Sequence, residues 1–210
     1  MLIAVWISVD SNGGIFFRQW RIGKNGKSFR IWKFRTMYPH ADSIRSITIG
    51  TTDNRITRAG LVLRKYKLDE LPQLFNVLAG TMSLVGPRPE LKKYVDLYSA
   101  QQLKILSIKP GITDIASLVF SNENQLLATV DEPELFYKEK VIPLKLKLNR
   151  IYIANHSTGN YFLFLYWSIL HLLHNPPARI QQLECTCKEW MHTSSEPIIT
   201  TTDAMAKVTA

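Results

Sequence analysis

The hydrophobic pattern of the first forty residues alternates in the way that short strands do. The runs Ile15 to Trp20 and Lys27 to Met37 flank the turn-forming segment Gly23 to Gly26, and the second run alternates apolar with charged side chains. This pattern predicts a β-hairpin whose two faces both carry cations. Before the hairpin, Met1 to Val9 is apolar and uncharged, and it ends at the turn formers Asp10 to Gly14.

From Asp69 onward the hydrophobic period becomes helical. Asp69 suits an N-cap, Pro72 suits a first turn, and Gly80 ends the pattern. Apolar residues occupy one side of the predicted helix and polar residues the other; they are Leu71, Leu74, Phe75 and Leu78 against Asp69, Glu70, Gln73 and Asn76. We therefore predict an amphipathic helix with two adjacent carboxylates at its start.

The rest of the chain predicts short strands and helices in mixed order. In sequence order we expect a strand at Met82 to Val85, a helix over Glu90 to Leu106, a strand at Ile115 to Phe120, a short helix from Ser121, a longer helix capped by Asp131 and bent at Pro143, and a helix over Asn160 to His174 capped by Ser157. Residues 176–210 are polar without a sustained period, so we expect a poorly ordered tail. Together these elements predict an α+β fold with one core.

Composition limits the class of protein to a folded domain. Hydrophobic residues make up 46% of the chain and charged residues 20%, which excludes a disordered or collagenous protein. Cys185 and Cys187 are too few for a disulfide framework and indicate a reducing compartment. The longest apolar stretches, Met1 to Val9 and Tyr161 to Leu173, fall short of the roughly 20 residues that a helix needs to cross a bilayer.

The net charge of +9 is concentrated at the N-terminal end. Residues 1–67 hold thirteen Lys or Arg against three Asp, whereas residues 68–210 hold thirteen bases against fourteen acids. A basic block of this kind favours phosphate, whether on a nucleotide, a nucleic acid or an anionic membrane.

The Asp69-Glu70 pair is the strongest candidate for chemistry. It directly follows the cations Arg64, Lys65 and Lys67, so an anionic phosphoryl group could be held there beside a nucleophile or a metal ligand. Taken alone, such a pair is more often a helix cap.

Further motifs surround this pair in a fixed order. They include Phe16-Phe17-Arg18-Gln19, Lys33-Phe34-Arg35-Thr36-Met37, Asp53-Asn54-Arg55-Ile56-Thr57-Arg58, Leu68 to Leu74, Met82 to Glu90 and Lys109 to Thr113. From about Leu2 to about Asn155 the chain closely resembles the bacterial sugar transferases, which are monotopic polyprenyl-phosphate phosphoglycosyl transferases that begin exopolysaccharide, capsule, O-antigen and glycan synthesis. Many members have Gly where this chain has Asp114.

The resemblance implies a two-step transfer from a UDP-sugar to a polyprenyl phosphate, usually undecaprenyl phosphate. It implies that Asp69 attacks the β-phosphate and releases UMP, and that the lipid phosphate then displaces the aspartate. Glu70 is expected to hold Mg²⁺. Arg88, held between two prolines, is expected at the active site; the other candidate phosphate or nucleotide ligands are Lys33, Arg35, Arg55, Arg58, Arg64 and Thr113.

The resemblance also divides the chain and places it in the cell. Residues 1–14 correspond to the second half of a re-entrant membrane helix, 15–175 to a small catalytic domain and 176–210 to the polar tail. We expect the cytoplasmic face of a bacterial inner membrane, with shallow binding to an anionic surface through the basic block and the apolar segments.

Two other interpretations compete with this enzyme. The aromatic and basic residues between 16 and 38 would suit a nucleic-acid-binding module, but that leaves the Asp-Glu-Leu-Pro-Gln block and the Gly-Pro-Arg-Pro turn unexplained, so no nucleic-acid partner is expected. The second is an inactive relative with an incomplete anchor. Release of UMP from UDP-sugars separates these interpretations.

Overall fold

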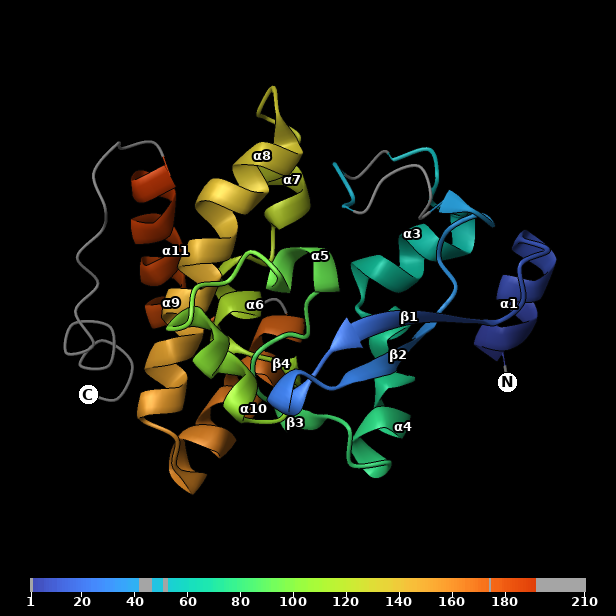
Figure 1. Cartoon of the computed structure of the whole chain (residues 1–210). Coiled ribbons are helices and arrows are strands. Elements are labelled where there is room, and N and C mark those ends of the chain that lie inside the picture. Colours follow the sequence, from blue (N-terminus) through green and yellow to red (C-terminus); the bar gives the residue numbers. More distant parts are fainter. Residues whose placement is uncertain (1, 42–46, 51–52, 174, 192–210) are drawn as a thin grey trace.

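The computed structural model describes residues 2–41, 47–50, 53–173 and 175–191, and it combines helices with two small sheets. The predicted α+β class is therefore confirmed. Figure 1 shows helices α9 (Ile142–Ala154) and α11 (Ala178–Met191) at one end of the molecule and α1 (Leu2–Asp10) and α3 (Arg58–Lys65) at the other, with a hairpin between them. Among the described helices, none is both long and apolar enough to cross a bilayer.

The predicted hairpin is present as strands β1 (Phe16–Ile22) and β2 (Ser28–Phe34), which pair antiparallel with Phe16 opposite Phe34. Because side chains alternate along a strand, Phe29, Ile31 and Lys33 share one face of β2. Phe29 and Ile31 are buried against Met82. The apolar contacts on this face therefore fix the side to which Lys33 points.

A second, parallel sheet joins strands β3 (Ser83–Val85) and β4 (Gly111–Thr113), which confirms the strand expected at Met82 to Val85. The chain passes very closely here, because a Cβ atom on Gly111 would lie only 2.1 Å from the Gly86 nitrogen. Glycine at these positions lets the turn after β3 lie against β4.

The main core lies among the helices of the second half of the chain. Helices α6 (Ile115–Val119), α9, α10 (Thr158–Leu172) and α11 surround buried residues such as Leu148, Tyr152 and Phe164. Ser157 caps α10 as expected, since its Oγ atom accepts the Asn160 N–H at 3.1 Å. The shorter elements are α4 (Gln73–Leu78), α5 (Lys92–Val95), α7 (Glu123–Leu127), α8 (Pro133–Phe136), 3-10 segments Lys24–Gly26, Leu68–Glu70 and Gln102–Ser107, and a π-helical segment Tyr137–Val141 that joins α8 to α9.

Two predicted elements are wrong in type or extent. Ile115 to Phe120 forms helix α6 and no strand, because Asp114 caps it by accepting the Ser117 N–H at 2.6 Å, and a short apolar run does not distinguish a buried helix from a strand. The single helix expected over Glu90 to Leu106 is instead α5 and a 3-10 segment with a break between them.

The predicted disordered tail is wrong for Ala178–Met191. These residues form α11, which buries Ile180, Leu183, Cys187 and Met191 in the main core. The core therefore continues past the domain boundary expected at residue 175. Residues 192–210 lie outside the described residues.

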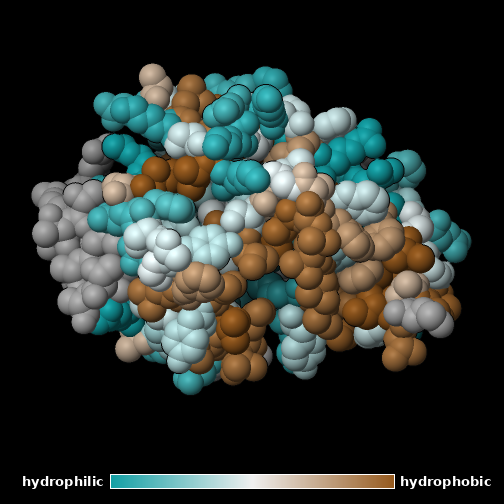
Figure 2. Space-filling model, turned by 90° about the horizontal axis from the view of Figure 1, so that it is seen from below, coloured by the Kyte–Doolittle hydropathy of each residue, from teal (hydrophilic) through white to brown (hydrophobic). Residues whose placement is uncertain are grey.

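Helix α4 presents its predicted apolar side to the outside. Gln73 and Asn76 are buried, whereas Leu78 is 84% exposed, and Leu71, Leu74 and Phe75 are exposed with it. Asn76 accounts for the reversal, because it accepts the Trp32 N–H at 3.0 Å and donates to the Arg30 carbonyl at 2.8 Å, so the polar side is bonded to β2. Figure 2, which views this end of the molecule, shows hydrophobic side chains around a notch in which hydrophilic atoms are visible.

Candidate active site

The two adjacent carboxylates lie in the turn between α3 and α4. Asp69 and Glu70 belong to the 3-10 segment Leu68–Glu70, and α4 begins only at Gln73, so Asp69 is not the N-cap that we predicted. Lys67, the residue before this 3-10 segment, has φ 56° and ψ 19°. This left-handed conformation reverses the chain after α3. Asp69 is only 7% exposed.

Two cations from distant parts of the chain bind Glu70. Lys33 Nζ donates to Glu70 Oε1 at 2.9 Å, and Arg88 Nη1 donates to Glu70 Oε2 at 3.1 Å. Arg88 Nη2 also donates to Glu70 Oε1, so the arginine binds both carboxylate oxygens. The lysine comes from β2 and the arginine from the rigid Gly-Pro-Arg-Pro turn after β3.

The pKa values of the two carboxylates move in opposite directions. Burial raises the pKa of Asp69, and Lys33 only partly offsets this effect. Burial also acts to raise the pKa of Glu70, but Arg88 and Lys33 outweigh it and hold that pKa well below its usual range. Glu70 is thus a fixed anion between two cations, whereas the charge of Asp69 is less compensated. Opposite shifts in neighbouring carboxylates are typical of a pair with divided roles.

The pair borders a polar cavity of about 250 Å³. Lys33, Arg64 and Arg88, three of the predicted phosphate ligands, line it together with both carboxylates. Arg64 is held by hydrogen bonds to Thr36 Oγ1 at 2.9 Å and Thr48 Oγ1 at 3.1 Å. The cavity therefore combines a nucleophile candidate with several donors for anionic oxygens.

The other predicted ligands lie elsewhere. Arg35 and Arg55 line a second polar cavity of about 160 Å³ that also reaches Asp69. Arg55 is bonded to Asp53 and to the backbone carbonyls of Ala41 and Ile47, so it holds its own loop together. Arg58 is exposed at the start of α3 and lines neither polar cavity.

Thr113 lines a third cavity, which is apolar and measures about 260 Å³. Its hydroxyl lies 2.8 Å from that of Ser168 on α10. The apolar cavity shares Lys67, Glu70 and Arg88 with the polar cavity of 250 Å³. The two cavities therefore meet beside the Asp69-Glu70 pair, which we call the dyad.

Several cavity residues were not singled out from the sequence. They are Ser117, Ser121, Glu123, Asn124 and Lys145, whereas Lys67 was named only as one of the cations before the pair. Lys67 adjoins the dyad motif and could have been chosen for that reason. Lys145 could not, because only the packing of α9 beside α7 brings it to the cavity, where it forms an ion pair with Glu123.

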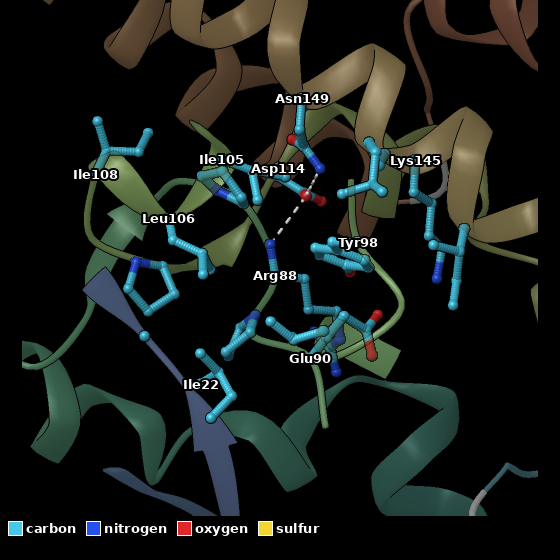
Figure 3. A pocket seen from close by; sticks show the side chains of 18 of the residues that line it. Ile22, Arg88, Glu90, Tyr98, Ile105, Leu106, Ile108, Asp114, Lys145 and Asn149 are labelled. Carbon is cyan, nitrogen blue, oxygen red and sulfur yellow. Dashed lines mark hydrogen bonds between the residues drawn. The ribbon is translucent and has the colours of Figure 1, made fainter. Parts of the chain in front are cut away.

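Asp114 positions the Arg88 turn through its buried carboxylate. Its Oδ2 atom accepts the Arg88 backbone N–H at 3.1 Å and the Asn149 amide at 2.6 Å, while its Oδ1 atom caps α6. Figure 3 shows Asp114 between Arg88 and Asn149 beside a narrow internal cavity of about 40 Å³. One buried carboxylate thus connects the arginine turn to both α6 and α9.

The donor set was tested for Mg²⁺. Among the described residues, no three His, Cys, Asp or Glu side chains gather as a complete metal site. Magnesium, however, commonly takes one or two carboxylates and completes its coordination with substrate phosphates and water. Asp69 and Glu70, which line a polar cavity of about 250 Å³, fit that mode of binding.

Comparisons with known proteins point to the same segment. A family model described as bacterial sugar transferase matches residues 1–175. The chain is 46% identical over 104 residues to the uncharacterized sugar transferase EpsL of Bacillus subtilis, across 50% of each protein. It is 42% identical over 119 residues to the UDP-N-acetylgalactosamine-undecaprenyl-phosphate N-acetylgalactosaminephosphotransferase of Aeromonas hydrophila, across 55% of this chain and 28% of that protein. It is 36% identical over 138 residues to the exopolysaccharide production protein ExoY of Rhizobium meliloti, across 59% and 61%. The match thus spans between 28% and 61% of the length of these relatives.

Proposed function

The chain belongs to the bacterial sugar transferase family, and from that membership we propose that it transfers a sugar 1-phosphate from a UDP-sugar to a polyprenyl phosphate. The observation that carries the proposal is the Asp69-Glu70 pair at a cavity lined by Lys33, Arg64 and Arg88. The named Aeromonas relative, a UDP-sugar and undecaprenyl-phosphate enzyme, supports the choice of donor and acceptor.

In the first step an oxygen of Asp69 attacks the β-phosphorus of the UDP-sugar. The bond from that phosphorus to the oxygen bridging the two phosphates breaks, and UMP leaves with the bonding electron pair. A sugar-phosphoryl aspartate remains. This role suits Asp69 because its buried carboxylate is less compensated by cations than that of Glu70.

In the second step an oxygen of the polyprenyl phosphate attacks the same phosphorus. The bond to Asp69 breaks, the free carboxylate returns, and polyprenyl-diphospho-sugar is released. Both steps bring anions together, so positive charge is needed at the cavity. Arg88 and Arg64 supply fixed donors for phosphate oxygens, and Lys33 supplies a point charge.

We assign Mg²⁺ to Glu70, with Asp69 and the substrate diphosphate nearby. When bound, the ion would offset negative charge on the diphosphate. Lys33 and Arg88 hold the Glu70 side chain in one orientation at the lining of the polar cavity.

We place the enzyme on the cytoplasmic face of a bacterial inner membrane. The outward apolar side of α4 and the exposed Phe162, Tyr166, Ile169 and Leu172 of α10 give it a surface suited to the lipid interface. The basic block of residues 1–67 adds attraction to anionic headgroups.

The test incubates the full chain with undecaprenyl phosphate and a panel of UDP-sugars in detergent. Turnover is measured as the release of UMP. Asp69→Asn keeps the size of the side chain but removes the attacking anion, so UMP release and any sugar-phosphate adduct found by mass spectrometry should vanish. Asp96→Asn is the matched control, because Asp96 is exposed and, within the described part of the chain, its one ion-pair partner is Lys92 on α5. Full activity of Asp69→Asn would remove Asp69 from this role, and an inactive wild-type chain with every donor would favour an inactive relative.

A further inference from the structure

The apolar cavity beside the dyad opens on the exposed apolar surface formed by α4 and α10. Its apolar lining comes from α4 and its preceding turn on one side and from α10 on the other, and includes Leu71, Leu74, Ile169 and Leu172. Each of these four side chains is between 44% and 51% exposed. The cavity is therefore continuous with the exposed apolar surface of both helices, and the notch in Figure 2 lies on that face.

One part of this cavity is charged. Lys67, Glu70 and Arg88 stand there, and the same three residues line the polar cavity. A ligand that entered from the apolar face would thus need a hydrocarbon body and an anionic head. Its head would arrive where both cavities meet.

The apolar cavity is large enough for part of such a ligand. A dry cavity of about 150 Å³ lined by Leu, Ile and Phe is enough to bind benzene. The cavity here measures about 260 Å³ and is therefore larger than that benzene-binding cavity.

We propose that this cavity binds the isoprene units next to the phosphate of the lipid acceptor, and that Lys67 binds that phosphate. The proposal rests on the proposed function and adds where the acceptor lies. Lys33 and Arg88 are bonded to Glu70, whereas the Lys67 ammonium has no ion-pair partner among the described residues. Its position at the junction of the two cavities lets it hold an acceptor phosphate beside Asp69.

This assignment separates the two substrates in space. The nucleotide-sugar occupies the polar cavity, and the lipid enters through the apolar one. The lipid phosphate can therefore approach the phosphorus bound to Asp69 without passing through the donor site. A bulky side chain in the apolar cavity should therefore block the lipid and leave the donor unaffected.

The first test fills the cavity with Leu74→Trp and, independently, Ile169→Trp. Leu78→Trp is the matched control, because Leu78 lies on the same exposed side of α4 but does not line the cavity. We expect the two filled variants to raise the KM for undecaprenyl phosphate at least tenfold. Exchange of labelled UMP into UDP-sugar without lipid, which reports the first step alone, should stay within twofold of wild type. Equal KM values for Leu74→Trp, Ile169→Trp and Leu78→Trp would overturn the proposal.

A binding experiment keeps this proposal separate from the enzyme assignment. Labelled undecaprenyl phosphate is bound to the full chain in detergent without any donor, in competition with undecaprenol, inorganic phosphate or dodecyl phosphate. We expect Lys67→Gln to weaken binding of the lipid phosphate about tenfold and to leave undecaprenol unchanged. Binding that depends on Leu74 and Lys67 but gives no transfer would retain the lipid site and reject the enzyme. Transfer with unchanged lipid binding in all of these variants would retain the enzyme and reject the lipid site. Competition by inorganic phosphate alone would show a free-anion site and overturn the lipid assignment.

Discussion

Lys33 and Glu70 lie 37 residues apart in the sequence, yet Lys33 Nζ donates a 2.9 Å hydrogen bond to Glu70 Oε1. The lysine shares a strand face with the buried Phe29 and Ile31, so the packing of the hairpin decides whether the cation reaches the dyad. A slip of one residue in β2 would turn Lys33 to the opposite face. The hairpin is therefore part of the framework of the proposed active site.

The first prediction concerns the cost of keeping Asp69 ionised. Burial raises its folded-state pKa, so the ionised form is disfavoured in the folded state, and stability is lost as pH rises from the ordinary value of 3.8 through the raised value. We therefore expect Asp69→Asn to raise the urea midpoint at pH 7 while turnover is lost. Below pH 3.8 the gain should disappear, because the wild-type carboxyl is then protonated in both states. A lower midpoint at pH 7 would contradict the direction of the shift.

The second prediction concerns Glu70 and magnesium. Chelation should abolish turnover and added Mg²⁺ should restore it, and Glu70→Gln should abolish turnover or require much more Mg²⁺. The low folded-state pKa of Glu70 adds a second readout: its stability contribution is present above the ordinary glutamate value and is lost as pH falls through the lowered one. Glu70→Gln should therefore lower the urea midpoint at pH 7. Glu134→Gln, which affects an exposed pair with Lys93, is the control, and turnover without metal would remove Glu70 from this role.

The third prediction tests Asp114 as a positioning residue. Asp114→Asn introduces an amide donor where the carboxylate accepts from Arg88, Ser117 and Asn149, so at least one buried donor loses its acceptor at a cost of about 1–3 kcal/mol. Because the Arg88 turn would shift, we expect kcat to fall at least tenfold at saturating UDP-sugar and lipid. Asp131→Asn, at an exposed position, is the control. A destabilised variant with unchanged kcat would leave Asp114 with a purely structural role.

The fourth prediction concerns membrane binding. Liposomes that contain anionic lipid should bind the chain, and high salt should weaken that binding without abolishing it. Salt screens the attraction of the basic N-terminal block, whereas burial of the apolar α4 and α10 surfaces persists. Leu78→Glu should reduce the salt-resistant fraction, while Leu97→Glu, which follows α5, should not. Complete release in high salt would remove the apolar contribution.

The sequence predicted local structure better than burial. The hairpin, the strand at Ser83–Val85 and the Ser157 cap follow from alternation and turn residues, whereas the nearness of Arg88 to Glu70 was expected from the family resemblance. The orientation of α4 did not, because amphipathic spacing identifies two sides of a helix without saying which of them is buried. Here the hydrogen bonds of Asn76 to the β2 backbone bury the polar side.

Long-range packing explains what else the sequence left out. Helix α11 carries Gln, Glu, Lys and Thr, and only its packing on the main core makes Ile180 and Leu183 into a buried side. Lys145 reaches the polar cavity through the position of α9, and no local spacing indicates it. Asp114 was noted as a departure from many relatives, but its three bonds depend on β4, α6 and α9 meeting at one point.

The left-handed backbone at Lys67 lowers the stability of the folded chain, and selection for stability alone would replace this lysine. A side chain with φ near 56° costs roughly 1–2 kcal/mol, and glycine avoids most of that cost. Lys67→Gly should thus make the turn easier to form while removing a cation from the junction of the two cavities. Engineering that selects for heat tolerance would favour this change, and by the proposed role of Lys67 the more stable protein would bind the lipid phosphate more weakly.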